Sequence, residues 1–164
     1  MKKGIYKSII YIGIIMSLSI LFGGCIRNPF KPAVKIGNIE SFKFSYQVGN
    51  YMNGWVAYSI VKEDDKWIAI IKHNEVAEEN AIKIDIKENK VKELEKVLEE
   101  YKIGKWDGFQ GSNKHVLDGH SFSLFIHFDD KTSIDASGYE KYPSNYKEFR
   151  EKMDSFFKEI EDNK

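Results

Sequence analysis

The chain has 164 residues with 25 basic and 25 acidic side chains, so its formal net charge at neutral pH is zero. Without a basic excess there is no electrostatic basis for binding nucleic acid, and nucleic acid is not an expected partner. A single cysteine excludes an intramolecular disulfide, and the length suits one domain with its own hydrophobic core.

The first 24 residues predict an export signal. Residues 1–7 include Lys2, Lys3 and Lys7, and residues 9–22 are apolar apart from Ser17 and Ser19. A basic start followed by an apolar core and small residues is typical of a secretory signal peptide. The alternative is a membrane-spanning helix, which needs about 20 apolar residues, more than this stretch supplies. Cleavage after residue 24 would leave a mature chain with a small acidic excess.

The signal ends in Leu21-Phe22-Gly23-Gly24-Cys25, which resembles the lipobox of bacterial lipoproteins. Gly23 and Gly24 match the small positions before the cysteine, whereas Phe22 stands where the family usually has leucine. The resemblance implies cleavage before Cys25 and a diacylglyceryl thioether on its sulfur. Two acyl chains suffice for stable anchoring, so membrane attachment at the extracytoplasmic face is expected. The alternative is an ordinary secretory signal followed by a free thiol.

Residues 25–36 are interpreted as the lipidated cysteine and a tether, and residues 37–164 as a single α+β domain. Strands are expected where apolar residues alternate with polar ones or run together. The expected strands are 42–48, 55–61, 67–71, 82–86, 122–128 and 132–136. Helical spacing of apolar residues predicts helices over 91–101 and 146–160.

Residues that are common at helix ends are expected at three of the four ends of the two helices. Asn89 is a candidate N-cap for the first helix, and Gly104 suits the left-handed position after it. Ser144 is a candidate cap for the last helix, with Pro143 in its first turn as the alternative.

These elements predict a two-layer arrangement in the order ββββ-α-ββ-α. A mostly antiparallel six-stranded sheet would carry both helices on one face. Because Trp55–Val61 is apolar on both faces, its second face should also be covered. The loop 105–119 or a partner would cover it.

No catalytic motif stands out. The four histidines lack zinc-helix spacing, the GxSxG and EF-hand patterns are absent, and no cofactor is expected. His115, Asp118 and His120 lie close in sequence and are candidates for a metal or acid–base site, with ordinary loop polarity as the alternative. Trp106 and Phe109 lie in the same loop, where they would either line a binding cleft or plug the sheet edge.

The C-terminal third carries a second resemblance. Four segments are similar to the corresponding part of a family of uncharacterised bacterial exported proteins and lipoproteins. These segments are 106–109, 117–128, 134–139 and 142–146, and the third ends at Tyr139. This similarity implies location and fold, and it supplies no catalytic residue.

The sequence therefore predicts a lipid-anchored, non-catalytic binding module at the cell envelope, with an envelope protein or a cell-wall ligand as its partner. Two alternatives stay open: a small envelope enzyme, and a purely structural envelope protein. The enzyme would use His115, Asp118 and His120. The candidate ligand-binding residues are Trp106, Phe109, His115, Asp118, His120 and Tyr139.

Overall fold

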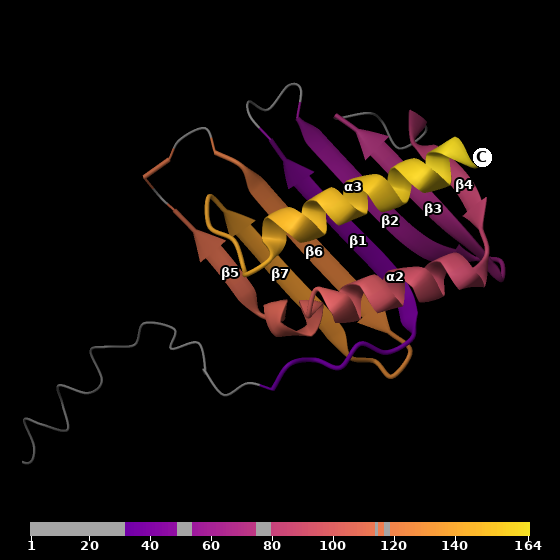
Figure 1. Ribbon diagram of the computed structural model, residues 1–164, viewed down its shortest axis with the longest axis horizontal. Helices are drawn as coiled ribbons and strands as arrows, with labels where there is room; N and C mark the ends of the chain where they lie inside the picture. The colour runs from indigo at the N-terminus through magenta and orange to yellow at the C-terminus, as the bar shows by residue number, and fades with distance from the viewer. Residues whose placement is uncertain (1–31, 49–53, 75–79, 114, 117–118) are drawn as a thin grey trace, which may run out of the picture. The chain divides into compact units, whose positions relative to one another are not determined.

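One sheet carries two helices on the same face (Figure 1). The computed structural model describes residues 32–48, 54–74, 80–113, 115–116 and 119–164. The predicted signal peptide and Cys25 lie outside the described residues. The expected α+β class, the mostly antiparallel sheet and the placement of both helices on one face are confirmed.

The sheet has seven strands in the order β4-β3-β2-β1-β6-β7-β5. Neighbouring strands pair antiparallel except β5, which runs parallel to β7. Their bounds are β1 (Ile39–Gln47), β2 (Trp55–Glu63), β3 (Lys66–His73), β4 (Ile82–Ile86), β5 (Phe109–Ser112), β6 (Ser121–Phe128) and β7 (Ser133–Tyr139).

The expected number of six strands is wrong because the segment interpreted as a loop contains β5. This strand has only four residues and includes Gly111, so its own pattern does not predict it. It forms because Phe109 pairs with Ala136 of β7, far along the chain.

The helices are α2 (Glu88–Glu100) and α3 (Tyr146–Asp162), and the short 3₁₀ helix η2 (Ile103–Trp106) follows α2. The expected caps are wrong. Lys87 occupies the N-cap of α2, so Asn89 lies inside the helix. Asn145, with φ of 62°, precedes α3, so both Ser144 and Pro143 lie before the cap.

Gly104 does not occupy the left-handed position after α2, because Lys102 adopts it with φ of 56°. Glycine is required at position 104 for a different reason. A Cβ there would lie 1.9 Å from the carbonyl oxygen of Val34. The N–H of Val34 donates to the Gly104 carbonyl at 3.0 Å, and Val34 and Ile36 pack against the core. The folded part of the chain therefore includes residues before 37.

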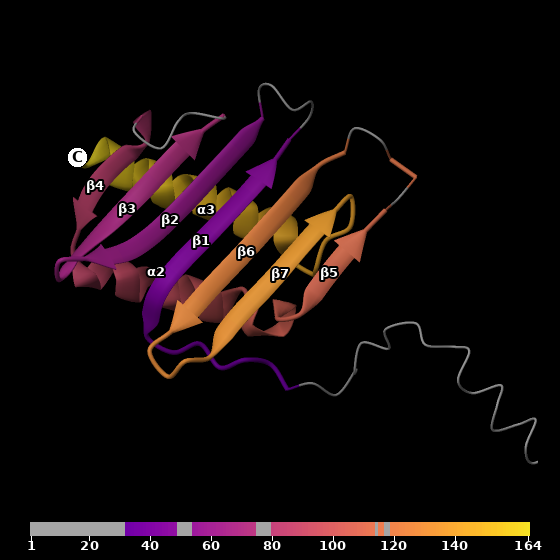
Figure 2. The same ribbon diagram turned by 180° about the vertical axis from the view of Figure 1, so that it is seen from behind.

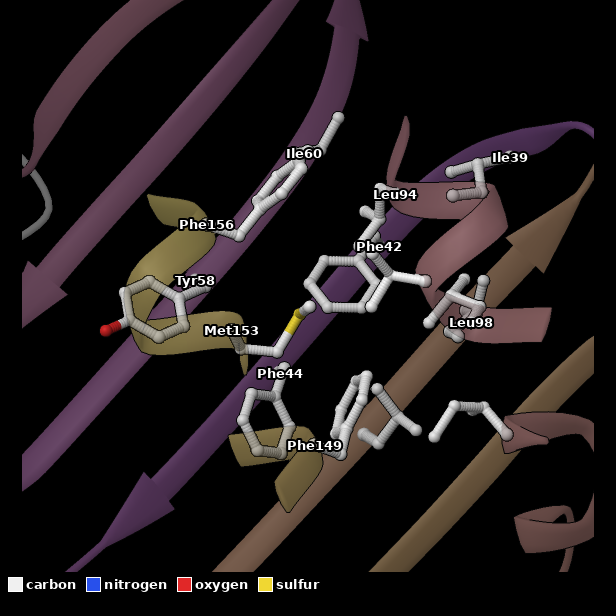
Figure 3. Packing of buried hydrophobic residues seen from close by; sticks show 14 of the residues in the cluster. Ile39, Phe42, Phe44, Tyr58, Ile60, Leu94, Leu98, Phe149, Met153 and Phe156 are labelled. Carbon is white, nitrogen blue, oxygen red and sulfur yellow. The ribbon is translucent and has the colours of Figure 1, made fainter. Parts of the chain in front are cut away.

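The core fills the space between the sheet and the helices (Figure 3). Phe42 and Tyr58, on β1 and β2, both stack on Phe157 of α3, with ring centroids 6.2 and 4.3 Å apart. Phe149 on α3 is fully buried and meets Phe44 edge-on at 5.3 Å. The helical spacing that predicts this helix gives one apolar stripe, in which Tyr146 is half-buried and the buried members are Phe149, Met153, Phe156, Phe157 and Ile160.

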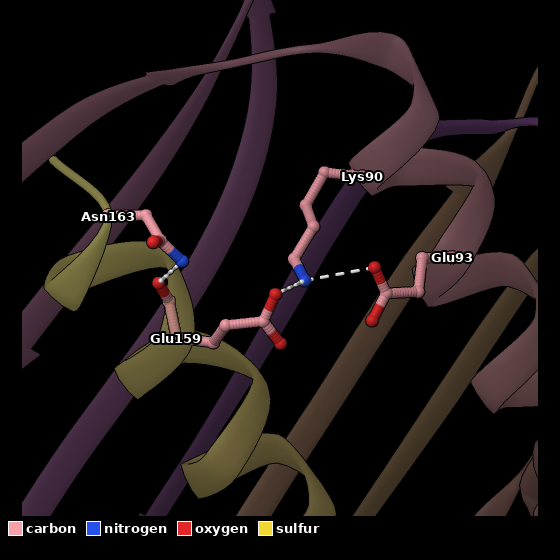
Figure 4. Close-up of polar contacts among 4 residues, drawn as sticks. All are labelled: Lys90, Glu93, Glu159 and Asn163. Carbon is pink, nitrogen blue, oxygen red and sulfur yellow. Dashed lines mark hydrogen bonds and ion pairs between the residues drawn. The ribbon is translucent and has the colours of Figure 1, made fainter.

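A cation joins the two helices where they lie side by side (Figure 4). Nζ of Lys90 on α2 lies 2.9 Å from Glu93 and 2.7 Å from Glu159 on α3. It also lies 4.6 Å from the centre of the Phe156 ring. Partial burial lowers the pKa of Lys90, but the hydrogen bonds to the two carboxylates outweigh it and raise the pKa overall. The ammonium is therefore a charged link between α2 and α3.

The other face of the sheet has no described segment lying across it (Figure 2). The segment 105–113, including β5, runs along one edge, so this part of the expected loop does not cover β2. On β2 and β3, Val61 and Ile68 pair across this face and are half-buried. Trp67 belongs to the helix-covered face, where it packs against the core. Among the described residues, no helix is long and apolar enough to cross a bilayer.

Candidate functional site

Trp106 and Phe109, two of the predicted ligand-binding residues, are buried. Trp106 is 2% exposed, donates from its indole N–H to the carbonyl of Ser144 at 3.2 Å, and meets Phe149 edge-on at 5.2 Å. Phe109 on β5 packs against Phe122 with ring centroids 6.2 Å apart. This arrangement favours the alternative in which the two aromatic residues close the edge of the core.

Tyr139 and His120 hold the returning end of the same segment. The Tyr139 hydroxyl accepts a hydrogen bond from the N–H of Gly119 at 2.8 Å and donates one to the carbonyl of Val116 at 3.1 Å. The main-chain carbonyl of His120 accepts from the Tyr142 hydroxyl at 2.9 Å. The bonds of Tyr139 fix the segment to β7, the bond from Tyr142 fixes it to the chain after β7, and none of them uses the His120 side chain.

The suggested metal or acid–base site is only partly described. His115 is exposed, and its backbone N–H donates to the Asn113 side chain at 3.2 Å. Asp118 lies outside the described residues. Within the described part of the chain, no group of three or more His, Cys, Asp or Glu residues is placed to hold a metal ion. A site built from His115, Asp118 and His120 stays a prediction.

A different set of polar residues meets between α3 and the sheet. Oδ1 of Asp154 accepts hydrogen bonds from the hydroxyls of Tyr46 at 2.6 Å and Tyr58 at 3.0 Å. Tyr46 follows Phe44 on the covered face of β1, and Phe44 pairs with Tyr58 of β2. Asp154 follows the buried Met153 on α3, so the helix brings its carboxylate to both phenols. Figure 3 shows Tyr58 at the margin of the core, with its hydroxyl directed away from the other rings.

Both phenols are weaker acids here than an ordinary tyrosine, because the pKa of each is raised. Burial first, and then the hydrogen bond to Asp154, raise the pKa of Tyr46 well above its ordinary value. Burial first, and then the neighbouring Tyr46 and Asp154, raise the pKa of Tyr58 further. Each hydroxyl therefore remains a protonated donor over the physiological range, and together they hold one oxygen of Asp154 in place.

Arg150 lies one helical turn before Asp154 on the same side of α3. Its guanidinium carbon lies 5.5 Å from the centre of the Tyr46 ring, a distance at which a cation is attracted to an aromatic face. Its Nε is buried and has no hydrogen-bond partner among the residues that the structure describes. The positive charge opposes the rise in the pKa of Tyr46, which desolvation dominates.

A cavity of about 250 Å³ opens beside this cluster, between the second half of α3 and strands β2 and β3. Tyr58, Ile71 and Phe157 supply its apolar wall. The polar residues that line it are His73, Asp154, Lys158, Glu161 and Asp162. The site therefore combines a preorganised carboxylate with an apolar surface and an acidic rim, a composition suited to binding a small polar group on an apolar stem.

Two larger cavities, of about 360 and 350 Å³, adjoin α2. They share Asn38, Lys92, Glu95 and Asp129, whose polar groups already bind one another. Asn38 donates to Asp129 at 2.7 Å and accepts from Lys92 at 2.6 Å, and Lys92 lies 3.0 Å from Glu95. This network ties the residue before β1 to α2 and to the turn between β6 and β7, and it uses the polar groups that the two cavities share.

The Asp154 site was not predicted from the sequence, although two signals for it exist. Tyr46 and Tyr58 occupy inward positions of strands, and a buried phenol needs a hydrogen-bond partner. Asp154 lies beside the apolar stripe of α3, so its carboxylate is placed to accept hydrogen bonds from phenols at the margin of the core. The sequence does not show that these three residues meet, because pairing them requires the packing of α3 on β1 and β2.

Fold and site together define a two-layer α+β domain with a half-open acidic cavity beside its second helix. No protein-family model matches the chain, and a search of curated proteins found no significant match.

Proposed function

We propose that the protein is a lipid-anchored, non-catalytic binding domain at the extracytoplasmic face of the cell membrane, and that the Asp154 cavity receives its ligand. The observation that carries the binding role is the pair of phenols that donate to one oxygen of Asp154. Because the phenols remain protonated, they orient a carboxylate and do not act as bases. Such a fixed acceptor beside an apolar wall suits recognition.

The anchor is proposed from the lipobox-like end of the signal and from Cys25, the only cysteine. The stretch from Cys25 to Pro32 reaches no more than about 25 Å when fully extended. A domain on such a tether would stay near the membrane, where an envelope protein or a cell-wall ligand is within reach.

Fractionation of cells that express the full chain tests the anchor. Cys25→Ala should move the protein from the detergent-extracted membrane fraction to the soluble extracytoplasmic fraction, whereas Asn28→Ala in the tether should leave it in the membrane. Phe22→Leu restores the usual residue and should raise the processed fraction. If wild-type protein is found mostly free of membranes, the lipid anchor is wrong.

Site-specific photo-crosslinking in intact cells tests the binding role. A photoreactive residue at His73, on the rim of the cavity, should give an adduct that Asp154→Asn reduces and Glu151→Gln does not. Glu151 is exposed on the same helix and provides the same change of charge away from the cavity. An adduct that persists in Asp154→Asn would show that recognition does not depend on this carboxylate. His115, Asp118 and His120 would then be the next residues to test. A cavity without any adduct would favour the purely structural alternative.

A further inference from the structure

We infer that the Asp154 cavity binds a primary ammonium group carried on an apolar stem. This inference rests on the proposed binding function and names the ligand chemistry of the same site. It follows from which oxygen of Asp154 has no described donor, from the charges on the rim, and from the size and apolar floor of the cavity.

The two carboxylate oxygens of Asp154 differ in their hydrogen-bond partners. Oδ1 of Asp154 accepts from two phenols, which uses its acceptor capacity, while no described residue donates to Oδ2. A guanidinium binds a carboxylate best with two parallel hydrogen bonds, one to each oxygen. That pairing is blocked here because Oδ1 is occupied. An ammonium is a compact donor that needs one oxygen at a time, so it fits the remaining acceptor.

The rim supplies the charge preference. Glu161 and Asp162 line the same cavity as Asp154, against one lysine, Lys158. The three carboxylates outnumber the two nearby cations, Lys158 in the lining and Arg150 one turn before Asp154, so the local field favours a cation over an anion. Lys158 lies one turn beyond Asp154 on α3, the spacing at which two side chains on a helix can meet. It is exposed and competes with the ligand for the same oxygen.

The cavity itself supplies the room for the stem, above apolar residues that lie beneath it. Tyr58 and Phe157 stack with centroids 4.3 Å apart and an interplanar angle of 6°, and Ile71 lies on the neighbouring strand. The three side chains are almost wholly buried, with Tyr58 5%, Ile71 2% and Phe157 0% exposed, so they form an apolar floor of which only edges reach the cavity. A chain of a few methylenes can enter the cavity above this floor while the terminal ammonium reaches Oδ2, because the cavity volume of about 250 Å³ accommodates a side chain of lysine size.

Titration of the ¹⁵N-labelled full chain in detergent with n-butylammonium, followed by amide chemical shifts, tests the inference. Shifts should cluster at residues 58, 71–73 and 154–162, with a dissociation constant on the order of millimolar, as expected for a few-atom ligand. n-Butylguanidinium should bind more weakly, and n-butanol and butyrate should give no clustered shifts. Tighter binding of the guanidinium, or equal binding of butanol, would overturn the assignment.

Variants separate the charge from the fold. Asp154→Asn should weaken binding about tenfold or more, and Glu161→Gln, which leaves the phenol bonds intact, about two- to threefold. Lys158→Ala should strengthen binding, and Glu151→Gln should leave it unchanged. Unchanged affinity in both Asp154→Asn and Glu161→Gln, with the shift pattern of the fold preserved, would contradict the inference.

A comparison of a lysine peptide with n-butylammonium distinguishes a lysine side chain from a free small amine as the ligand. A Gly-Lys-Gly peptide with blocked ends that binds at least tenfold more tightly than n-butylammonium would identify a lysine side chain as the ligand. Equal affinity would identify a free small amine. Both outcomes are independent of fractionation, so the proposed anchor can fail while the ammonium site stands.

Discussion

The hydroxyl of Tyr46 lies 2.6 Å from Oδ1 of Asp154, although 108 positions separate the two residues in sequence. This bond joins α3 to β1, the middle strand of the sheet, at a polar point in the layer between helices and sheet. It links the stability of the domain to the geometry of the proposed site, and most of the tests below use it or the core around it.

Loss of the acceptor should destabilise the domain. Asp154→Ala leaves the hydroxyls of Tyr46 and Tyr58 without their partner, and the free energy of unfolding should fall by about 2–4 kcal/mol. Asp154→Asn keeps an oxygen acceptor and should cost about 1 kcal/mol or less. Urea unfolding followed by circular dichroism measures both. The account would be contradicted if Asp154→Ala were no more destabilising than Glu151→Ala.

The same phenols predict a loss of stability in alkali. Burial raises the pKa of Tyr46 and of Tyr58 above the ordinary value of about 10. Below that pH each phenol is protonated in both the folded and the unfolded chain, so the full contribution is present. Above it the unfolded chain releases protons that the folded chain retains. The free energy of unfolding should then fall by up to about 1.4 kcal/mol per pH unit for each tyrosine.

Tyr58→Phe isolates this effect from the titration of lysines. At pH 7 the variant should be less stable than the wild type because it lacks one hydrogen bond. Between pH 10 and 11.5 the difference should shrink, since phenylalanine has no proton to lose. Urea unfolding at several pH values measures the gap, and a gap that widens with pH would show that the pKa of Tyr58 is not raised.

Phe149 should be a major contributor to core stability. It is fully buried and meets Phe44, Tyr101 and Trp106 edge-on. Phe149→Ala removes this packing and leaves a cavity, so the free energy of unfolding should fall by about 3–5 kcal/mol. Phe125, which is 42% exposed on the uncovered face, is the matched control, and Phe125→Ala should cost well under half as much. Similar losses in the two variants would be inconsistent with the described core.

Gly138 should not tolerate a side chain. A Cβ at this position would lie 2.2 Å from the carbonyl oxygen of Lys141 and 2.5 Å from the ring of Phe122. Gly138→Ala should therefore lower the free energy of unfolding by about 1–3 kcal/mol. A Cβ at Gly37 meets Phe128 at 3.7 Å, an ordinary contact, so Gly37→Ala should be close to neutral. Thermal unfolding of the two variants side by side gives the comparison.

Lys90 should contribute through both its charge and its packing. Lys90→Met keeps an apolar stem near Phe156 but removes the bonds to Glu93 and Glu159. The free energy of unfolding should fall by about 0.5–1 kcal/mol at low salt and by less at high salt, because salt screens the ion pairs. Lys92→Met, whose partners lie away from α3, should show no effect on the docking of the two helices. Equal salt dependence in both variants would argue against a special role for Lys90.

Much of the fold could be predicted from local sequence patterns. Alternation along Phe42, Phe44 and Tyr46 predicts a half-buried strand because successive side chains point to opposite faces of a sheet. Helical spacing predicts α3 and its buried stripe for the equivalent reason. The helix caps were misplaced because capping residues are common outside caps, and the chain used left-handed Lys102 and Asn145 at these points.

The sequence by itself determined the α+β class, the two helices on one face and the segments of most strands, because periodicity and burial are local properties. It also predicts an export signal and a lipid anchor on Cys25, and both stay predictions. Only the tertiary structure decided that Phe109 joins β7 as a seventh strand and that Tyr46, Tyr58 and Asp154 meet beside a cavity. Those contacts join residues far apart in the chain, and no local pattern encodes which distant elements will pack together.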